Sequence, residues 1–252
     1  ATDLFLPNHS GVTNHHETKI ERFKTTLTAG SIPFSDAFKG GENVLRPVFD
    51  SQEMIYGSIF SLLDNASSNL NATVNAIDVS GDVIYGGNVS KWKKAANSIR
   101  ARHELQLSEV NGSSAYSAAL AALSNGFASN ADDMEVPFET ANKNPIFQFM
   151  EQRTDIRMGS TLVDMLAATD DPRLPFYAAV DGDGNYTGSV PGSQNSAASH
   201  PGSYNAGASA PTVLMSYAEL KFIEAECKFM LGQSGAQEAF EEAVAASVLK
   251  VT

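Results

Sequence analysis

Apolar residues recur three and four positions apart in several stretches of the chain, which is the spacing of one face of an α-helix. The clearest stretch predicts a helix over about 51–70, with Ile55, Ile59, Leu62, Leu63, Ala66 and Leu70 on its apolar face. A second helix is predicted over 90–108, with Trp92, Ala95, Ala96, Ile99 and His103 on one side. Shorter patterns predict helices over 17–27, 113–123 and 159–168.

Polar residues just before these stretches can accept hydrogen bonds from the free N–H groups of a first helical turn. Asp50, followed by Glu53, has the spacing of a capping box at the start of the helix over 51–70. Ser90 is the expected cap of the helix over 90–108. Trp92, the single tryptophan, then falls in the first turn of that helix and is expected to anchor its packing.

The C-terminal stretch has the most regular pattern. It predicts a helix over 217–231 that ends at Gly232, and a second helix capped by Ser234, so that 217–249 forms an antiparallel pair. A pair of this length, about 34 residues, is typical of a tetratricopeptide unit, which needs neighbouring helices to bury its apolar face. We therefore predict a mainly α-helical fold with tetratricopeptide-like helix pairs, long irregular loops and at most a few short strands.

A long irregular region opens at Asp170, and its residues 181–211 have little periodicity and are rich in Gly, Ser, Asn and Pro. A loop of this length inside a domain is usually functional or mobile. The segment Asp181-Gly-Asp-Gly-Asn185 resembles the start of a calcium-binding loop, but Tyr186 and Gly192 stand where an EF-hand requires Gly and Glu. The Asp-Gly pairs favour the tip of a β-hairpin instead.

The charge and the absence of familiar motifs exclude several classes of function. A net charge of −12 disfavours nucleic acid, so the five basic residues around Trp92 are interpreted as a solvated helix face. Cys227 has no partner for a disulfide, and His9, His15 and His16 do not have the spacing of a metal site. No stretch reaches the roughly 18 apolar residues of a membrane-spanning helix.

No catalytic constellation stands out in the sequence. The motifs of serine hydrolases, phosphate loops, zinc proteases and dinucleotide-binding folds do not occur. The adjacent carboxylates Asp132-Asp133 and Asp170-Asp171 are interpreted as loop ends or helix caps. We therefore expect no catalytic residues, no metal and no cofactor.

Aromatic residues in the loop region are the best candidates for ligand binding. Tyr177, Tyr186 and Tyr204 lie in or beside the 170–210 loops, and Asn185 is next to one of them. An aromatic ring can cover the apolar C–H face of a sugar while amides bond its hydroxyls, so these residues suit a neutral polyhydroxyl ligand. The alternative is that the rings fix the loops to the helical scaffold.

Several segments together resemble the SusD/RagB-like outer-membrane lipoproteins. The segment Asp82-Val-Ile-Tyr-Gly-Gly-Asn-Val-Ser-Lys-Trp-Lys-Lys-Ala-Ala-Asn-Ser-Ile-Arg-Ala-Arg102 is similar to a motif of that family. Four further segments follow the order of the family: Ile32-Pro-Phe-Ser-Asp-Ala37 with Phe49-Asp50, Asp171-Pro-Arg-Leu174, Tyr186-Thr-Gly-Ser-Val-Pro-Gly192 and Ser216-Tyr-Ala-Glu-Leu-Lys-Phe-Ile-Glu-Ala-Glu226. The resemblance covers residues 30–250.

The resemblance implies a non-enzymatic lipoprotein on the cell-surface side of the outer membrane of a Gram-negative bacterium. Such a protein binds oligosaccharides, or peptides in some members, and delivers them to a TonB-dependent, SusC-like transporter. Residues 1–252 would form a single SusD-like domain with a loop-rich insertion at about 170–211. Family members are about twice as long, so we expect an incomplete chain that lacks the lipid anchor. A helical-repeat interaction scaffold and a hydrolase of the same surface systems remain alternatives.

Overall fold

The computed structural model describes residues 30–72 and 80–252. The predicted helix over 17–27 and the residues His9, His15 and His16 lie outside these ranges. The described chain is mainly helical, with two short strands, as the sequence predicts. It divides into two compact units, one formed by Ala1–Phe127 with Met230–Gly232 and the other by Ala128–Phe229 with Gln233–Thr252.

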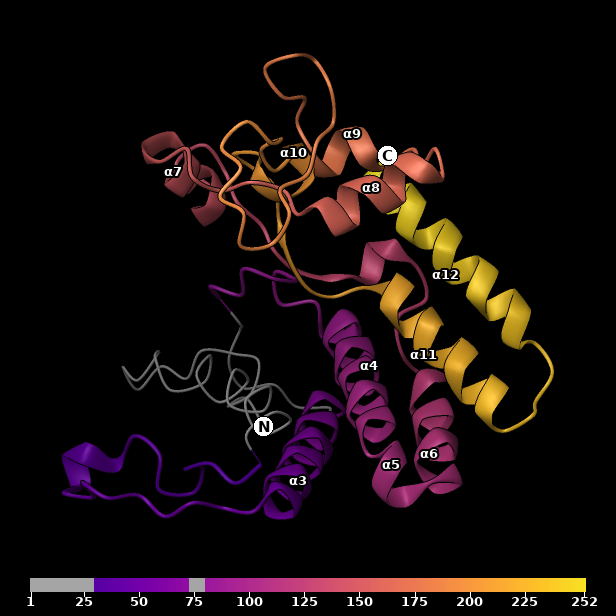
Figure 1. The fold of residues 1–252 in the computed structure, drawn as a ribbon. Helices are drawn as coiled ribbons and strands as arrows, with labels where there is room; N and C mark the ends of the chain where they lie inside the picture. Colours follow the sequence, from indigo (N-terminus) through magenta and orange to yellow (C-terminus); the bar gives the residue numbers. More distant parts are fainter. Residues whose placement is uncertain (1–29, 73–79) are drawn as a thin grey trace. The chain divides into compact units, whose positions relative to one another are not determined.

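The first long helix of unit 1 is α3, Gln52–Leu70, close to the predicted range (Figure 1). Its cap is Ser51, whose side chain accepts a hydrogen bond from the Met54 N–H, so the prediction of Asp50 as the cap is wrong. The Asp50 carboxylate instead accepts from the backbone N–H groups of Phe34 and Ser35, at 2.9 and 2.6 Å. Asp50 therefore holds the preceding connector against the start of the helix.

The second long helix is α4, Val89–Gln106, and it begins one residue before the predicted cap. The Asn88 side chain accepts from the Lys91 N–H, so Asn88 and not Ser90 is the cap. Trp92 is only 2% exposed, and its indole N–H donates to a carboxylate oxygen of Asp82 at 2.7 Å. The same carboxylate oxygen accepts from the Gly87 N–H, which ties the glycine-rich turn to the packing anchor.

Helices α3, α4 and α6, Ser113–Leu123, pack together in unit 1, and α5, Ser108–Asn111, joins the last two. A short 3-10 helix, η1, Lys39–Glu42, precedes them. One buried core cluster consists of Ile32, Ile55, Tyr56, Ile59, Leu63 and Ala96. The buried Ser98 hydroxyl accepts from the Phe127 N–H at 3.0 Å and so connects α4 to the end of the unit.

The basic residues of α4 are less solvated than predicted. All five are only partly exposed. Arg100 pairs with Asp64 of α3 and lies over the Phe60 ring, with 5.4 Å between the guanidinium carbon and the ring centroid. Arg100 therefore helps to pack α4 against α3 and is not part of a free basic face.

Unit 2 begins with η2, Asn130–Asp132, and β1, Met134–Val136, and β1 pairs antiparallel with β2, Thr212–Met215. The partners are Met134 with Met215 and Val136 with Thr212, with an irregularity after Met134. Between the strands lie α7, Pro145–Gln152, α8, Ser160–Ala168, α9, Leu174–Tyr177, and α10, Ser203–Ala206. Two strands thus bracket the whole loop-rich region of the chain.

The predicted C-terminal helix pair is present as α11, Tyr217–Met230, and α12, Ala236–Val251, which run side by side in Figure 1. The Phe222 and Phe240 rings meet edge to face at 5.7 Å, and Lys221 pairs with Glu242 at 2.6 Å. The cap of α12 is Gly235 in a left-handed conformation and not Ser234. A positive φ is a conformation that glycine adopts without a Cβ penalty.

A buried charge cluster connects both C-terminal helices to β1. The Asp133 carboxylate accepts from the Tyr217 N–H at the start of α11, at 2.6 Å, and from the Lys250 ammonium of α12, at 2.5 Å. Lys250 also pairs with Glu135 of β1. Burial raises the pKa of Asp133, and the Lys250 ammonium and the Tyr217 amide oppose that rise. Asp133 therefore acts as a helix cap, as the sequence suggests.

Candidate functional site

Two of the predicted ligand residues meet in unit 2. Tyr177 ends α9 and Tyr204 lies in α10, and their rings contact edge to face with 5.3 Å between centroids and 80° between planes. Both side chains are partly exposed. Burial raises the pKa of the Tyr204 hydroxyl, so this phenol stays protonated and can donate a hydrogen bond at neutral pH. The pair can offer ring edges and two hydroxyl groups.

The contact between α9 and α10 depends on a close approach of two backbone segments. The Gly202 N–H donates to the Tyr177 carbonyl at 2.7 Å, next to an isolated bridge between Ala178 and Pro201. A Cβ at Gly202 would collide with the Phe176 carbonyl oxygen. Glycine is therefore required where the two tyrosine-bearing segments cross.

Asn185 and Tyr186 belong to a turn organised by Asp181. One Asp181 carboxylate oxygen accepts from the Asp183 and Asn185 N–H groups, both at 2.9 Å, and the other accepts from the Thr187 hydroxyl. These bonds lower the pKa of Asp181, the Asn185 amide most of all. The expected β-hairpin is absent, because neither flank of this turn forms a strand. The Asn185 side chain is exposed, and Tyr186 is partly exposed.

Ser199 and His200 connect the later loop to the segment that follows α7. Ser199 is fully buried, and its hydroxyl accepts from the Thr187 N–H at 3.0 Å. Its carbonyl accepts from the Met158 N–H at 2.8 Å. Nδ1 of His200 lies 3.0 Å from the Ile156 carbonyl oxygen, so this nitrogen donates, and Nε2 is left to accept from the Arg157 guanidinium. These hydrogen bonds help to fix this part of the chain.

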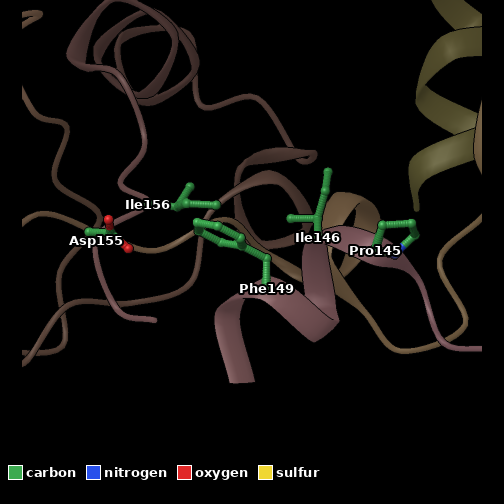
Figure 2. Close-up of a pocket in the computed structure, with 5 residues that line it drawn as sticks. All are labelled: Pro145, Ile146, Phe149, Asp155 and Ile156. Atoms are coloured by element: carbon green, nitrogen blue, oxygen red, sulfur yellow. The ribbon is translucent and has the colours of Figure 1, made fainter. Parts of the chain in front are cut away.

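A shallow apolar hollow of about 340 Å³ lies beside α7, lined by Pro145, Ile146, Phe149, Asp155 and Ile156. In Figure 2 the Phe149 ring extends from α7 towards Ile156 and Asp155, while Pro145 and Ile146 lie nearer the start of the helix. Helix α7 is not among the helices predicted from the apolar spacing. The available signal was Asn144-Pro145, a capping residue followed by proline at the first helical position.

An ion pair stands at the rim of this hollow. Arg153 and Asp155 form a two-bond pair, Nε to Oδ1 at 3.2 Å and Nη2 to Oδ2 at 2.6 Å, and both side chains are more than half exposed. The guanidinium carbon also lies 5.2 Å from the centroid of the Phe149 ring. The Arg153 hydrogen bonds lower the pKa of Asp155, which keeps the carboxylate ionised and able to accept.

The structure therefore brings the Tyr177 and Tyr204 rings into contact, whereas Asn185 and Tyr186 follow each other in the turn around Asp181.

Within 30–72 and 80–252, no group of three or more His, Cys, Asp or Glu residues could hold a metal ion. Nor does any helix in those ranges have both the length and the apolarity that crossing a membrane requires. Burial raises the pKa of the Cys227 thiol to about 12, so this thiol is not a nucleophile at neutral pH.

Comparisons with known proteins give relatives of the same fold. A SusD/RagB family protein from Bacteroides thetaiotaomicron has 29% identity and a TM-score of 0.75, over 88% of this chain and 49% of its own. A chitin-binding SusD homologue from Flavobacterium johnsoniae has 26% identity and a TM-score of 0.77, over 90% of this chain and 50% of its own. A structure described as a chitin-binding protein has 28% identity and a TM-score of 0.77, over 94% and 56%.

The chain thus spans about half the length of these solved structures. A search of curated protein sequences found no match. The SusD-like family model, described as starch-binding associating with outer membrane, matches residues 19–251. Because that match covers nearly the whole chain, the chain belongs to the SusD-like family.

Proposed function

We propose that this chain is part of a non-enzymatic, cell-surface lipoprotein that binds oligosaccharides. The observation that carries the proposal is the family match over residues 19–251, together with similarity to two structures described as chitin-binding. The mixed character of the loop region supports it, because partly exposed aromatic rings beside polar groups suit the apolar faces and hydroxyls of sugars. The protein would act at the outer membrane and deliver its ligand to a TonB-dependent, SusC-like transporter.

For the ligand we propose contacts from Tyr177, Tyr204, Tyr186 and Asn185. The Tyr177–Tyr204 pair is held by a backbone crossing that does not depend on the ligand, so its rings are positioned before binding. Asn185 has an exposed side-chain amide on a turn fixed by Asp181. An amide offers one acceptor and two donors, which matches the dual character of a sugar hydroxyl. We also propose that residues 1–252 form a single SusD-like domain.

Binding to a panel of soluble glycans tests the function. Chitohexaose, maltohexaose and a peptide mixture would be titrated against the purified protein by calorimetry. We expect one of the two hexasaccharides to bind, and we expect Tyr177→Ala to weaken that binding while the exposed Phe229→Ala in α11 does not. Binding of peptides alone would favour the peptide-binding alternative. Co-purification of a transporter with no glycan retained would favour the scaffold, and hydrolysis of a glycan would contradict a non-enzymatic role.

A further inference from the structure

We propose that the hollow beside α7 is a subsite for a pyranose ring that carries an apolar substituent, with an acetamido sugar as the ligand class. This rests on the proposed glycan-binding function and adds a location that the tyrosine residues do not cover. The first observation is that α7 has no buried residue, although its apolar side chains gather on one side. Ile146 and Phe149 remain 42% and 41% exposed, whereas α3, α4, α6, α8, α11 and α12 all bury residues.

The walls of the hollow are fixed before any ligand arrives. Asn144, 2% exposed, caps α7 by accepting from the Ile146 N–H at 2.8 Å and anchors it by donating to the Ala210 carbonyl at 2.8 Å. The opposite wall is held because the Ile156 carbonyl accepts from His200. Both anchors come from the segment 200–210, so the two walls share one support. A preformed hollow loses little conformational entropy on binding.

The lining of the hollow selects the chemistry of the ligand. Four of its five residues are apolar, so a hydroxyl placed against them would lose hydrogen bonds to water without replacement. A methyl group of an acetamido substituent would gain from the same surface. The Phe149 ring can contact the C–H face of the sugar, because Arg153 lies over one face of the ring and the ring still remains 41% exposed.

The rim then supplies the polar contacts. Asp155 is ionised and more than half exposed, and a carboxylate has about four lone-pair positions, of which Arg153 occupies two and the Asp155 backbone N–H a third. The remaining position can accept from a ring hydroxyl, and the other N–H groups of Arg153 can donate to ring oxygens. A purely apolar partner would leave this rim pair unused. The combination of an apolar floor and a charged rim therefore favours an acetamido sugar over a lipid or an apolar peptide.

Titration of chitohexaose and maltohexaose against matched variants tests the subsite. Phe149→Ala should weaken chitohexaose binding about tenfold, the size of one aromatic contact. Phe149→Tyr should retain most of the affinity, and Asp155→Asn should weaken it about threefold. Phe229→Ala is the control, because Phe229 is 75% exposed and lies in α11 of the same unit. Circular dichroism would verify that each variant keeps its helix content.

The outcomes separate this inference from the proposed function. Unchanged chitohexaose affinity in Phe149→Ala and Asp155→Asn would overturn the subsite while leaving glycan binding intact. An equal loss for chitohexaose and maltohexaose would overturn the choice of an acetamido sugar. If the unmodified protein binds neither hexasaccharide, the proposed function fails and the subsite fails with it. If Phe149→Tyr loses as much affinity as Phe149→Ala, the ring contact is contradicted.

Discussion

The helical core of unit 1 and the loop-rich segment 153–211 of unit 2 are stabilised in different ways. In the core, apolar side chains of α3 and α4 bury one another, and Trp92 is 2% exposed. In the loop segment, polar side chains bond directly to backbone groups, as Asp181 and Ser199 do. Burial is non-directional, whereas a hydrogen bond requires one partner at one distance and angle.

This difference has a consequence for binding. A segment shaped by hydrogen bonds does not need to bury its aromatic residues, so Tyr177 and Tyr204 keep part of their surface exposed. The rings of the core have no such freedom, because their burial is the stabilising force. The loop segment can therefore present aromatic surface to a ligand without weakening the fold.

The largest effect is expected in the helical core. Trp92→Ala should lower the free energy of unfolding by about 3–5 kcal/mol, because it leaves a cavity and removes the indole N–H that donates to the Asp82 carboxylate. Urea denaturation followed by circular dichroism measures this change. Val110→Ala is the control, since Val110 is 79% exposed and its truncation should change stability by less than about 0.5 kcal/mol. A similar result for both variants would contradict the role of Trp92 as the packing anchor.

A smaller, local effect is expected at the crossing of α9 and α10. Gly202→Ala should lower the free energy of unfolding by about 1–3 kcal/mol, because the added Cβ forces the Phe176 carbonyl and the 201–202 backbone apart. Hydrogen exchange should show faster exchange at the Gly202 and Ala179 N–H groups and no change in α3 or α4. Gly182→Ala is the matched control, because nothing lies within 4 Å of a Cβ at that position. Global unfolding of Gly202→Ala would show that the loop segment is not a separately stabilised region.

The smallest effect is expected at the Asp171–Arg173 ion pair, in the dependence of stability on pH. The Arg173 guanidinium, 2.6 Å from Asp171, lowers the pKa of that carboxyl to about 2. Because the folded pKa lies below the ordinary value of about 3.9, the pair contributes its stability above about pH 4 and loses it as the pH falls towards 2. Between pH 4 and 2, the free energy of unfolding of Asp171→Asn should therefore depend less on pH than that of the unmodified protein. An identical pH dependence in both proteins would rule out this contribution.

The sequence predicts the long helices well and their first residues less well. The apolar spacing gave the positions of α3, α4, α6, α8, α11 and α12, because one periodic face must be buried in each. The caps fell one or two residues away, at Ser51, Asn88 and Gly235. Asp50 illustrates the reason. Its carboxylate accepts from the backbone N–H groups of Phe34 and Ser35 instead. These partners are distant in the sequence, so a capping rule based on neighbouring residues does not predict them.

The site was harder to predict for the same physical reason. Tyr177 and Tyr204 meet through a bridge between Ala178 and Pro201, and no periodic pattern encodes a pairing of two irregular segments. The helix α7 is only eight residues long and buries nothing, so its apolar residues give a weak signal. Its start was still readable from Asn144-Pro145. Long-range backbone bonds, rather than side-chain spacing, decide where these residues lie.

Hydrogen exchange with and without chitohexaose locates the glycan-binding surface. If the loop-rich part of unit 2 binds glycans, the sugar should slow exchange in 144–158 and in 174–206, and leave α3, α4 and α6 unchanged. Maltohexaose serves as the comparison, and Phe149→Ala should abolish the protection of 144–158 alone. Binding of chitohexaose with protection confined to the helices of unit 1, or with no protection in either loop segment, would contradict glycan binding by the loop-rich part of unit 2.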